Sequence, residues 1–141
     1  MANSQVFTTS AKVDALTAIV PNANTIKAAL YLASASIGAG TAAYTATGEV
    51  SGTNYSAGGV TVTHANAATS SGTTAYWTPS ASIVYTTVTL STSFDCVLIY
   101  DSSRSNASVS AHTFGSQTVT AGTFTITMPT NDATNGLVRI A

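Results

Sequence analysis

Charged side chains are scarce in this sequence. Its 141 residues include 4 Lys and Arg and 5 Asp and Glu, so charged residues make up 6% of the chain, against about 25% in a typical soluble protein. The formal net charge is -1. Such a low charge gives little electrostatic attraction to nucleic acid or to an anionic membrane, and we expect neither as a partner.

Cysteine and long apolar runs are also missing. The single cysteine, Cys96, excludes an intramolecular disulfide framework and any metal site built from several cysteines. No apolar segment approaches the ~18–20 residues that span a bilayer, and the first residues lack the basic stretch and apolar core of a secretory signal. We therefore expect a chain that is made in a cytoplasm and folds without disulfides.

Small and hydroxyl-bearing residues take the place of the charges. Thr (26), Ala (24) and Ser (18) together account for 68 of the 141 residues, while hydrophobic residues still make up 45%. Because threonine favours extended backbone and its hydroxyl tolerates solvent, this composition favours β-structure. Surfaces of this kind lose their water cheaply when a partner binds, and they lack the charges that usually protect strand edges. The chain is therefore expected to work as part of an assembly.

The apolar pattern predicts one short helix near the N-terminus. Val13, Leu16 and Val20 are spaced by three and four residues, as on one face of a helix. Ser10 is the expected cap, and Pro21 is expected to end the helix.

After the helix the period changes to two, which is typical of strands. Gly115-Ser116-Gln117 is expected to interrupt the chain, and the segment 33–59, with six glycines, is expected to form an extended excursion or to contain a turn of helix. The predicted strands are 26–32, 60–63, 75–78, 83–90, 94–100, 107–114, 124–128 and 137–140.

About eight short strands at intervals of about ten residues are typical of a β-sandwich. We predict an all-β protein: a single antiparallel β-sandwich domain over residues 1–141, jelly-roll-like, with one short N-terminal helix. In this prediction residues 1–24 form an N-terminal arm and the helix, and residues 33–59 form a Gly-rich excursion loop that is the best candidate for a surface arm.

Residues that could perform catalysis are few and scattered. Asp95 and Asp101 bracket a strand of about 20 Å and cannot form a close pair; all five carboxylates are interpreted as solvated turn and cap residues. His64 and His112 are interpreted as ordinary strand residues, and Cys96 as a buried, apolar side chain. No Gly-x-Ser-x-Gly elbow is present. We expect no catalytic residues, no metal site and no cofactor.

Glu49 is the most informative of the carboxylates. It stands alone in a Gly-rich loop between Gly48 and Gly52. This placement suggests an ion-pair partner for a lysine or arginine at an interface.

The segment Tyr44–Gly59 reads YTATGEVSGTNYSAGG. It resembles a loop with the pattern Y-T-x-x-G-E-V-x-G-x-x-Y-x-x-G-G, which follows an early strand in small virion proteins of tailed bacteriophages and prophages. The likeness continues through Trp77, Tyr100-Asp101, Phe114-Gly115 and the strand from Phe124 to Pro129. It covers most of the chain from Leu30 onward.

The resemblance implies a capsid-decorating, or cementing, protein. Such a protein would be made in the host bacterial cytoplasm and would bind the outer surface of the shell formed by the phage major capsid protein. It would also associate with itself as a homodimer or homotrimer. The 44–59 loop is the expected contact region, and its candidate interface residues are Tyr44, Glu49, Asn54 and Tyr55.

Two other classes of function remain open at this point. One is a tail, neck or adhesive module that binds a host-surface glycan, which exposed aromatics around Tyr55, Tyr76 or Trp77 would favour. The other is an enzyme, which would need a cleft joining His64 or His112 to a carboxylate.

Overall fold

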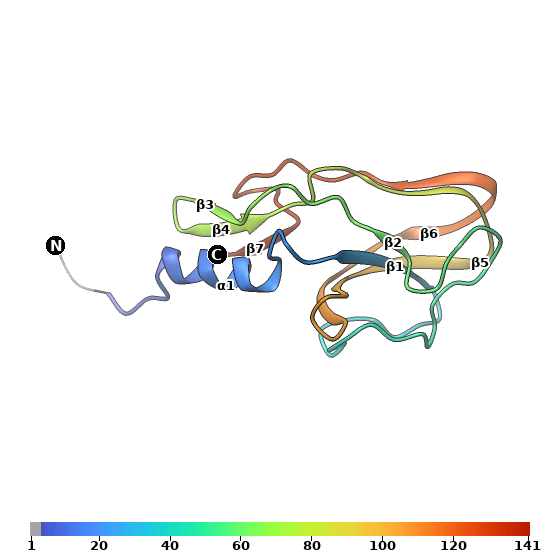
Figure 1. The fold of residues 1–141 in the computed structure, drawn as a ribbon, viewed down its shortest axis with the longest axis horizontal. Coiled ribbons are helices and arrows are strands. Elements are labelled where there is room, and N and C mark those ends of the chain that lie inside the picture. Colours follow the sequence, from blue (N-terminus) through green and yellow to red (C-terminus); the bar gives the residue numbers. More distant parts are fainter. Residues whose placement is uncertain (1–3) are drawn as a thin grey trace.

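The computed structural model describes residues 4–141, in which one helix and seven strands form two antiparallel sheets packed as a sandwich (Figure 1). The strand orders are β2-β1-β5-β6 and β3-β4-β7. The predicted antiparallel β-sandwich with one short N-terminal helix is confirmed; the first three residues of the predicted arm lie outside the described residues. The elements are α1 (Thr9–Ile19), β1 (Ile26–Leu32), β2 (Val60–Thr61), β3 (Thr69–Ser71), β4 (Thr74–Trp77), β5 (Ile83–Asp101), β6 (Ala107–Ile126) and β7 (Val138–Ile140).

Helix α1 begins before the predicted cap and ends where the sequence indicates. Its N-cap is Thr8, which has extended backbone and makes no side-chain cap hydrogen bond, so the prediction of Ser10 as the cap is wrong. At the other end the Val20 N–H donates to the Leu16 carbonyl at 3.0 Å, and Pro21 cannot continue the helix. Leu16 and Val20 are buried, which confirms the predicted apolar face.

Two cationic side chains attach the helix to the rest of the protein through backbone carbonyls. The Lys12 side chain is buried, and its Nζ donates to the Thr73 carbonyl, between β3 and β4, at 2.9 Å. Arg104 donates to the Ala18 carbonyl at 3.3 Å. The helix therefore lies against the three-stranded sheet, as Figure 1 shows.

Strand β1 is buried on both of its faces. Ile26, Ala28 and Leu30 belong to the main hydrophobic core. Ala29 and Tyr31, on the opposite face, belong to a second and smaller cluster. The predicted alternation of β1 is confirmed, and two separate layers must cover this strand.

Strands β5 and β6 are much longer than predicted, at 19 and 20 residues. The segments predicted as the separate strands 83–90 and 94–100 both lie within β5, and Gly115-Ser116-Gln117 lies inside β6 instead of interrupting it. The prediction of short strands was wrong here because the β5–β6 ladder absorbs its bends through shifts of register, such as the one between Phe94 and Cys96.

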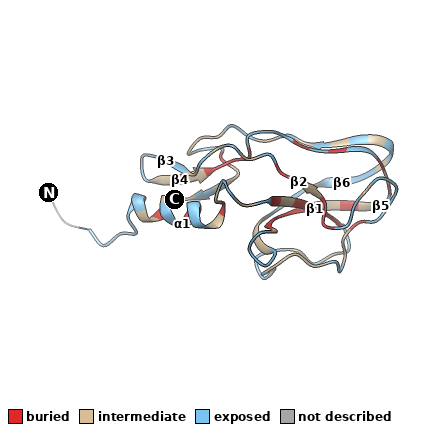
Figure 2. Cartoon of the chain, viewed as in Figure 1, coloured by how far each residue is buried: buried red, intermediate tan, exposed pale blue. Residues whose placement is uncertain are grey.

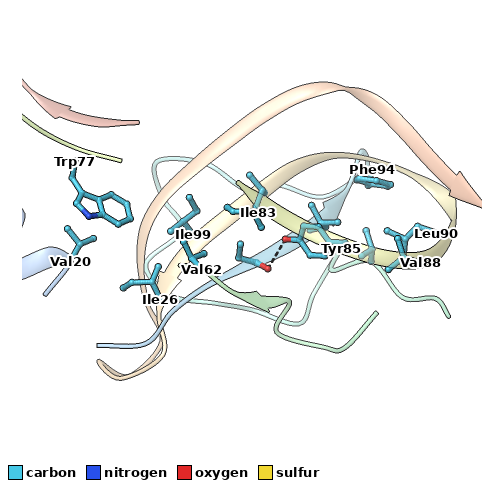
Figure 3. Packing of buried hydrophobic residues seen from close by; sticks show 14 of the residues in the cluster. Val20, Ile26, Val62, Trp77, Ile83, Tyr85, Val88, Leu90, Phe94 and Ile99 are labelled. Atoms are coloured by element: carbon cyan, nitrogen blue, oxygen red, sulfur yellow. Dashed lines mark hydrogen bonds between the residues drawn. The ribbon is translucent and has the colours of Figure 1, made fainter. Parts of the chain in front are cut away.

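The β5–β6 hairpin folds back over itself and encloses the main core (Figures 1 and 3). Tyr85, in the first half of β5, donates its hydroxyl to the Ala28 carbonyl of β1 at 2.8 Å. Ala28 in turn pairs with Ile99, in the second half of β5. Phe94 and Phe124 meet edge-on inside the fold, with ring centroids 5.0 Å apart.

Residues 33–59 pack against the fold and do not project as a surface arm (Figure 1). Residues 35–44 cover the outer face of the four-stranded sheet, whereas residues 48–53 bond along the edge of β1 and then to Thr89 of β5, and Val50 joins the main core. No turn of helix forms in this segment. Ala35, Ile37 and Tyr44 pack against the second cluster, which consists of Ala29, Tyr31, Cys96, Leu98 and Tyr100. Residues 35–44 are therefore the cover that the second face of β1 requires.

The backbone at Thr87 is strained. Its φ is 52°, a left-handed conformation that is costly for a β-branched residue. Because glycine adopts this conformation freely, we expect Thr87→Gly to raise the free energy of unfolding by about 1 kcal/mol. The exposed neighbour Thr86 is the control: Thr86→Gly should lower the free energy of unfolding by about 1 kcal/mol. Urea denaturation measures both, and equal destabilisation by the two changes would contradict the strain.

Candidate functional site

Two candidate residues of the 44–59 loop, Tyr44 and Tyr55, meet at the carboxylate of a third, Glu49. Its Oε2 accepts a hydrogen bond from the Tyr44 hydroxyl at 2.6 Å. Its Oε1 accepts from the Tyr55 hydroxyl at 2.7 Å and from the Gly58 N–H at 2.7 Å. We call Tyr44, Glu49, Tyr55 and Gly58 the Glu49 network. Three donors converge on one half-buried anion, and hydrogen bonds to charged groups are among the stronger ones in proteins.

The Glu49 network is attached to two strands at once. The Tyr55 hydroxyl accepts a hydrogen bond from the Leu30 N–H of β1 at 3.0 Å. The Tyr44 ring stacks on Tyr100 of β5, with centroids 5.0 Å apart, and the Tyr100 hydroxyl donates to the Gly58 carbonyl at 2.7 Å. The network therefore fastens the excursion to the face of the sheet.

Two glycines of the loop are required by its close approach to the sheet. A Cβ on Gly59 would lie 1.7 Å from the Ala28 carbonyl oxygen, and Gly59 also has a φ of +72°. A Cβ on Gly52 would lie 2.0 Å from the Thr89 carbonyl oxygen. No other residue fits at these positions without moving the backbone. Two glycines of the motif, Gly52 and Gly59, are therefore explained by close packing of the loop backbone against the strands.

The tyrosines around Glu49 are held in their neutral form. Burial, with the negative charge of Glu49 as a further cause, raises the pKa of Tyr31 to about 12. Burial is also the main reason that the pKa values of Tyr55, Tyr85 and Tyr100 are raised. For Tyr44 the main cause of the raised pKa is its hydrogen bond to Glu49. These phenols donate hydrogen bonds and are poorly suited to act as bases.

The position of Glu49 bears on the ion pair that the sequence suggested. All three of its hydrogen bonds come from within the chain. These donors occupy three of the roughly four acceptor positions of the carboxylate, so a lysine or arginine of a partner would share it with groups of this chain. In this arrangement the first role of Glu49 is to hold the loop in one shape.

Asn54, the fourth candidate residue, lies outside the Glu49 network. It is exposed, with a φ of 60°, and its Nδ2 donates to the Thr87 carbonyl of β5 at 2.9 Å. It holds the far end of the loop against the bend of the hairpin. Sequence analysis did not include Tyr100 or Leu30 with the loop, since nothing in the local pattern indicates which strand residues a distant loop will contact.

The prediction that the other carboxylates are solvated turn and cap residues is wrong for two of them. Asp95 lies inside β5 and is half-buried. The interpretation of Asp101 as a solvated turn residue is wrong: it is fully buried and accepts hydrogen bonds from Asn24 Nδ2 at 2.6 Å and from the Ser103 N–H at 2.9 Å. Asp132 does lie in a turn, where hydrogen bonds, chiefly from Asn135, lower its pKa.

The thiol and the imidazoles do not come together at a site. Cys96 is buried, as predicted, and burial raises the pKa of its thiol. Burial lowers the pKa of His112, whose ring contacts the Ser110 hydroxyl, while His64 Nε2 contacts the Asn24 carbonyl. Within residues 4–141, no group of three or more His, Cys, Asp or Glu residues is arranged to hold a metal ion.

In the same described part of the chain, none of the helices has the length and apolar character needed to cross a membrane. Comparison of the chain with models of protein families, with curated proteins and with solved structures found no match in any of the three.

Removing the charge of Glu49 should destabilise the protein. Glu49→Gln replaces one acceptor oxygen with a donor group that faces another donor, and we expect the free energy of unfolding to fall by about 2 kcal/mol. Asp14 is exposed on α1, so Asp14→Asn is the matched control and should change stability by less than about 0.5 kcal/mol. Urea denaturation distinguishes them, and equal effects would contradict the role given to Glu49.

Alkaline pH should unfold the protein as the tyrosines ionise. In the folded state the pKa values of Tyr31, Tyr44, Tyr55, Tyr85 and Tyr100 all lie above the unfolded value of 10.0. The stability that these groups contribute is therefore fully present below pH 10 and is lost as the pH rises through the folded values. Tyrosinate absorbance and circular dichroism should change together. Ionisation of all five near pH 10 without unfolding would contradict the burial.

Proposed function

We propose that this chain is a non-enzymatic structural protein of a phage virion, which decorates and stabilises the capsid by binding the outer surface of the major capsid protein shell. The observation that carries the proposal is that several of the few charged side chains are buried or half-buried, so that the surface carries even less charge than the sequence does. Asp101 and Lys12 are buried, and Glu49 is half-buried and engaged by internal donors. The remaining surface consists largely of hydroxyl, methyl and backbone groups, which lose water cheaply on contact.

The 44–59 loop supports the same function. Its sequence resembles that of small virion proteins of tailed phages, and in the structure it is fixed by the Glu49 network before any partner binds. A loop that is already ordered loses little conformational entropy on binding. Such a loop is suited to repeated attachment at many equivalent places on a shell.

Stabilisation of the shell would follow from mass action. A protein that binds the closed shell, and not the opened one, stabilises it by RT ln(1 + [L]/Kd) for each site. Self-association would add avidity, because linked copies engage neighbouring capsid subunits together. No chemical step is needed.

The adhesive alternative is not favoured by two of the three aromatic side chains that it requires; the third, Tyr76 of β4, is half-buried. Trp77 is fully buried, and its Nε1 donates to the Asn66 carbonyl at 3.1 Å. Tyr55 is half-buried, with its hydroxyl used in the Glu49 network. Neither side chain is free to serve as the stacking platform that a glycan-binding rim requires.

Shells stripped of this chain should bind it again with little dependence on salt. We expect the purified protein to raise the melting temperature of such shells, and we expect the Kd to change less than about tenfold between low and moderate salt, because few charges are available to be screened. Calorimetry of the shells and a sedimentation assay across a NaCl series measure both quantities. An attachment that collapses at moderate salt would contradict the proposal.

The copy number per virion is the complementary measurement. Quantitative mass spectrometry against the major capsid protein should give a simple fraction of its abundance, corresponding to hundreds of copies. A few to a few dozen copies would assign the chain to the neck or tail instead. Its absence from purified virions would overturn both structural assignments.

A further inference from the structure

Strand β6 is the long edge of the four-stranded sheet, and most of its outer side is unpaired. Its first residues are covered: the Ser108 N–H donates to the Ala42 carbonyl at 3.0 Å, and Ala43 forms a bridge with Ala107. From residue 109 to residue 126, no other strand or bridge of residues 4–141 lies along this edge. The opposite edge strand, β2, has two residues.

The β6 edge has none of the usual protection against pairing with another strand. Proteins protect exposed edges with charges, proline or short length. Residues 107–126 contain no Asp, Glu, Lys, Arg or Pro. The apolar side chains of β6 that pack on the core are only partly buried, and Figure 2 shows this strand in tan and pale blue. These side chains are Val109, Phe114, Val119, Phe124 and Ile126.

The segment 110–113 is the most regular part of the free edge. It pairs with β5 in unbroken register, from Ile99 opposite Ser110 to Cys96 opposite Thr113. Farther along, the ladder shifts between Phe94 and Cys96, and Ala121 has a φ of 46°. A second strand can therefore pair most easily at 110–113. A cleft of about 340 Å³ opens beside this segment, between residues 38–41 and β6, and could receive side chains of the added strand.

We propose that two copies of this chain pair through residues 110–113 in antiparallel orientation, so that their four-stranded sheets join into one. At a two-fold axis centred on this segment, Ser110 of one copy faces Thr113 of the other, and any charge on the edge would be present twice with no counter-charge. The edge carries none. Hydroxyls such as those of Ser110 and Thr113 both donate and accept hydrogen bonds, and they are therefore complementary to themselves. These features favour a second copy over a charged partner.

Sedimentation of the full chain, from micromolar to hundreds of micromolar, tests the pairing. We expect a monomer–dimer equilibrium. Thr113→Lys puts a charge on the pairing edge, which is how natural edge strands are protected against pairing, and should raise the dimer Kd by about tenfold or more. Thr69→Lys makes the same change at an exposed position of the short edge strand β3 and should leave the Kd unchanged. A wild-type monomer or trimer, or equal effects of the two variants, would overturn the proposal.

Two further measurements keep the result independent of folding defects and of other contacts. In the wild type, amide hydrogen exchange at 110–113 should slow as the dimer forms, while exchange at 69–71 should not; the absence of slowing would overturn the pairing. Phe7, exposed in the N-terminal segment, offers another apolar contact. If Phe7→Ser abolishes the dimer, the N-terminal segment is the occupant and the proposal fails. The proposed dimer does not require a capsid. If no dimer is found, the proposed binding to the capsid is not contradicted.

Discussion

The burial of β1 on both faces is the constraint on which the rest of the structure depends. None of its seven residues is exposed, and a strand with no solvated face must be covered twice. One cover is the folded β5–β6 hairpin, which brings large apolar side chains such as Tyr85 and Phe94 to the main core. The other cover comes from residues 35–44 of the excursion 33–59, which contribute few large apolar side chains. The two covers must therefore be held by different forces.

Hydrogen bonding to one carboxylate compensates for what the excursion lacks in apolar area. Ala35, Ile37 and Tyr44 are its apolar residues that pack on the second cluster, and all three are only partly buried. Glu49 adds three hydrogen bonds to a charged acceptor, and Gly52 and Gly59 allow the backbone to approach until it touches the strands. A charge at this place is favourable because all three of its donors, from Tyr44, Tyr55 and Gly58, come from the excursion itself. Because charged residues are rare in this chain, the position of the Glu49 carboxylate is the more important.

Sequence patterns predicted what depends on neighbouring residues and missed what depends on distant ones. The alternation of β1 and the end of α1 at Pro21 are local and were predicted. The continuity of β6 through Gly115 was not, because a glycine marks either a break or a bend and the ladder with β5 decides which. The burial of Asp101 depends on Asn24, 77 residues away in the chain. Within the candidate site, the motif indicated which loop residues to examine, but their partners Leu30 and Tyr100 come from strands, and only the fold brings them together.

The scarcity of charge has a consequence for a protein that covers a shell. If hundreds of copies lie side by side, any net charge per copy is repeated across the surface, and repulsion grows with every neighbour added. A chain with a net charge of -1 largely avoids this repulsion, and its hydroxyl groups keep it hydrated before it binds. The same feature removes the protection that charges give to strand edges. A low-charge surface and an unprotected β6 edge therefore have one origin in composition, and a protein that works in a crowded array can use both.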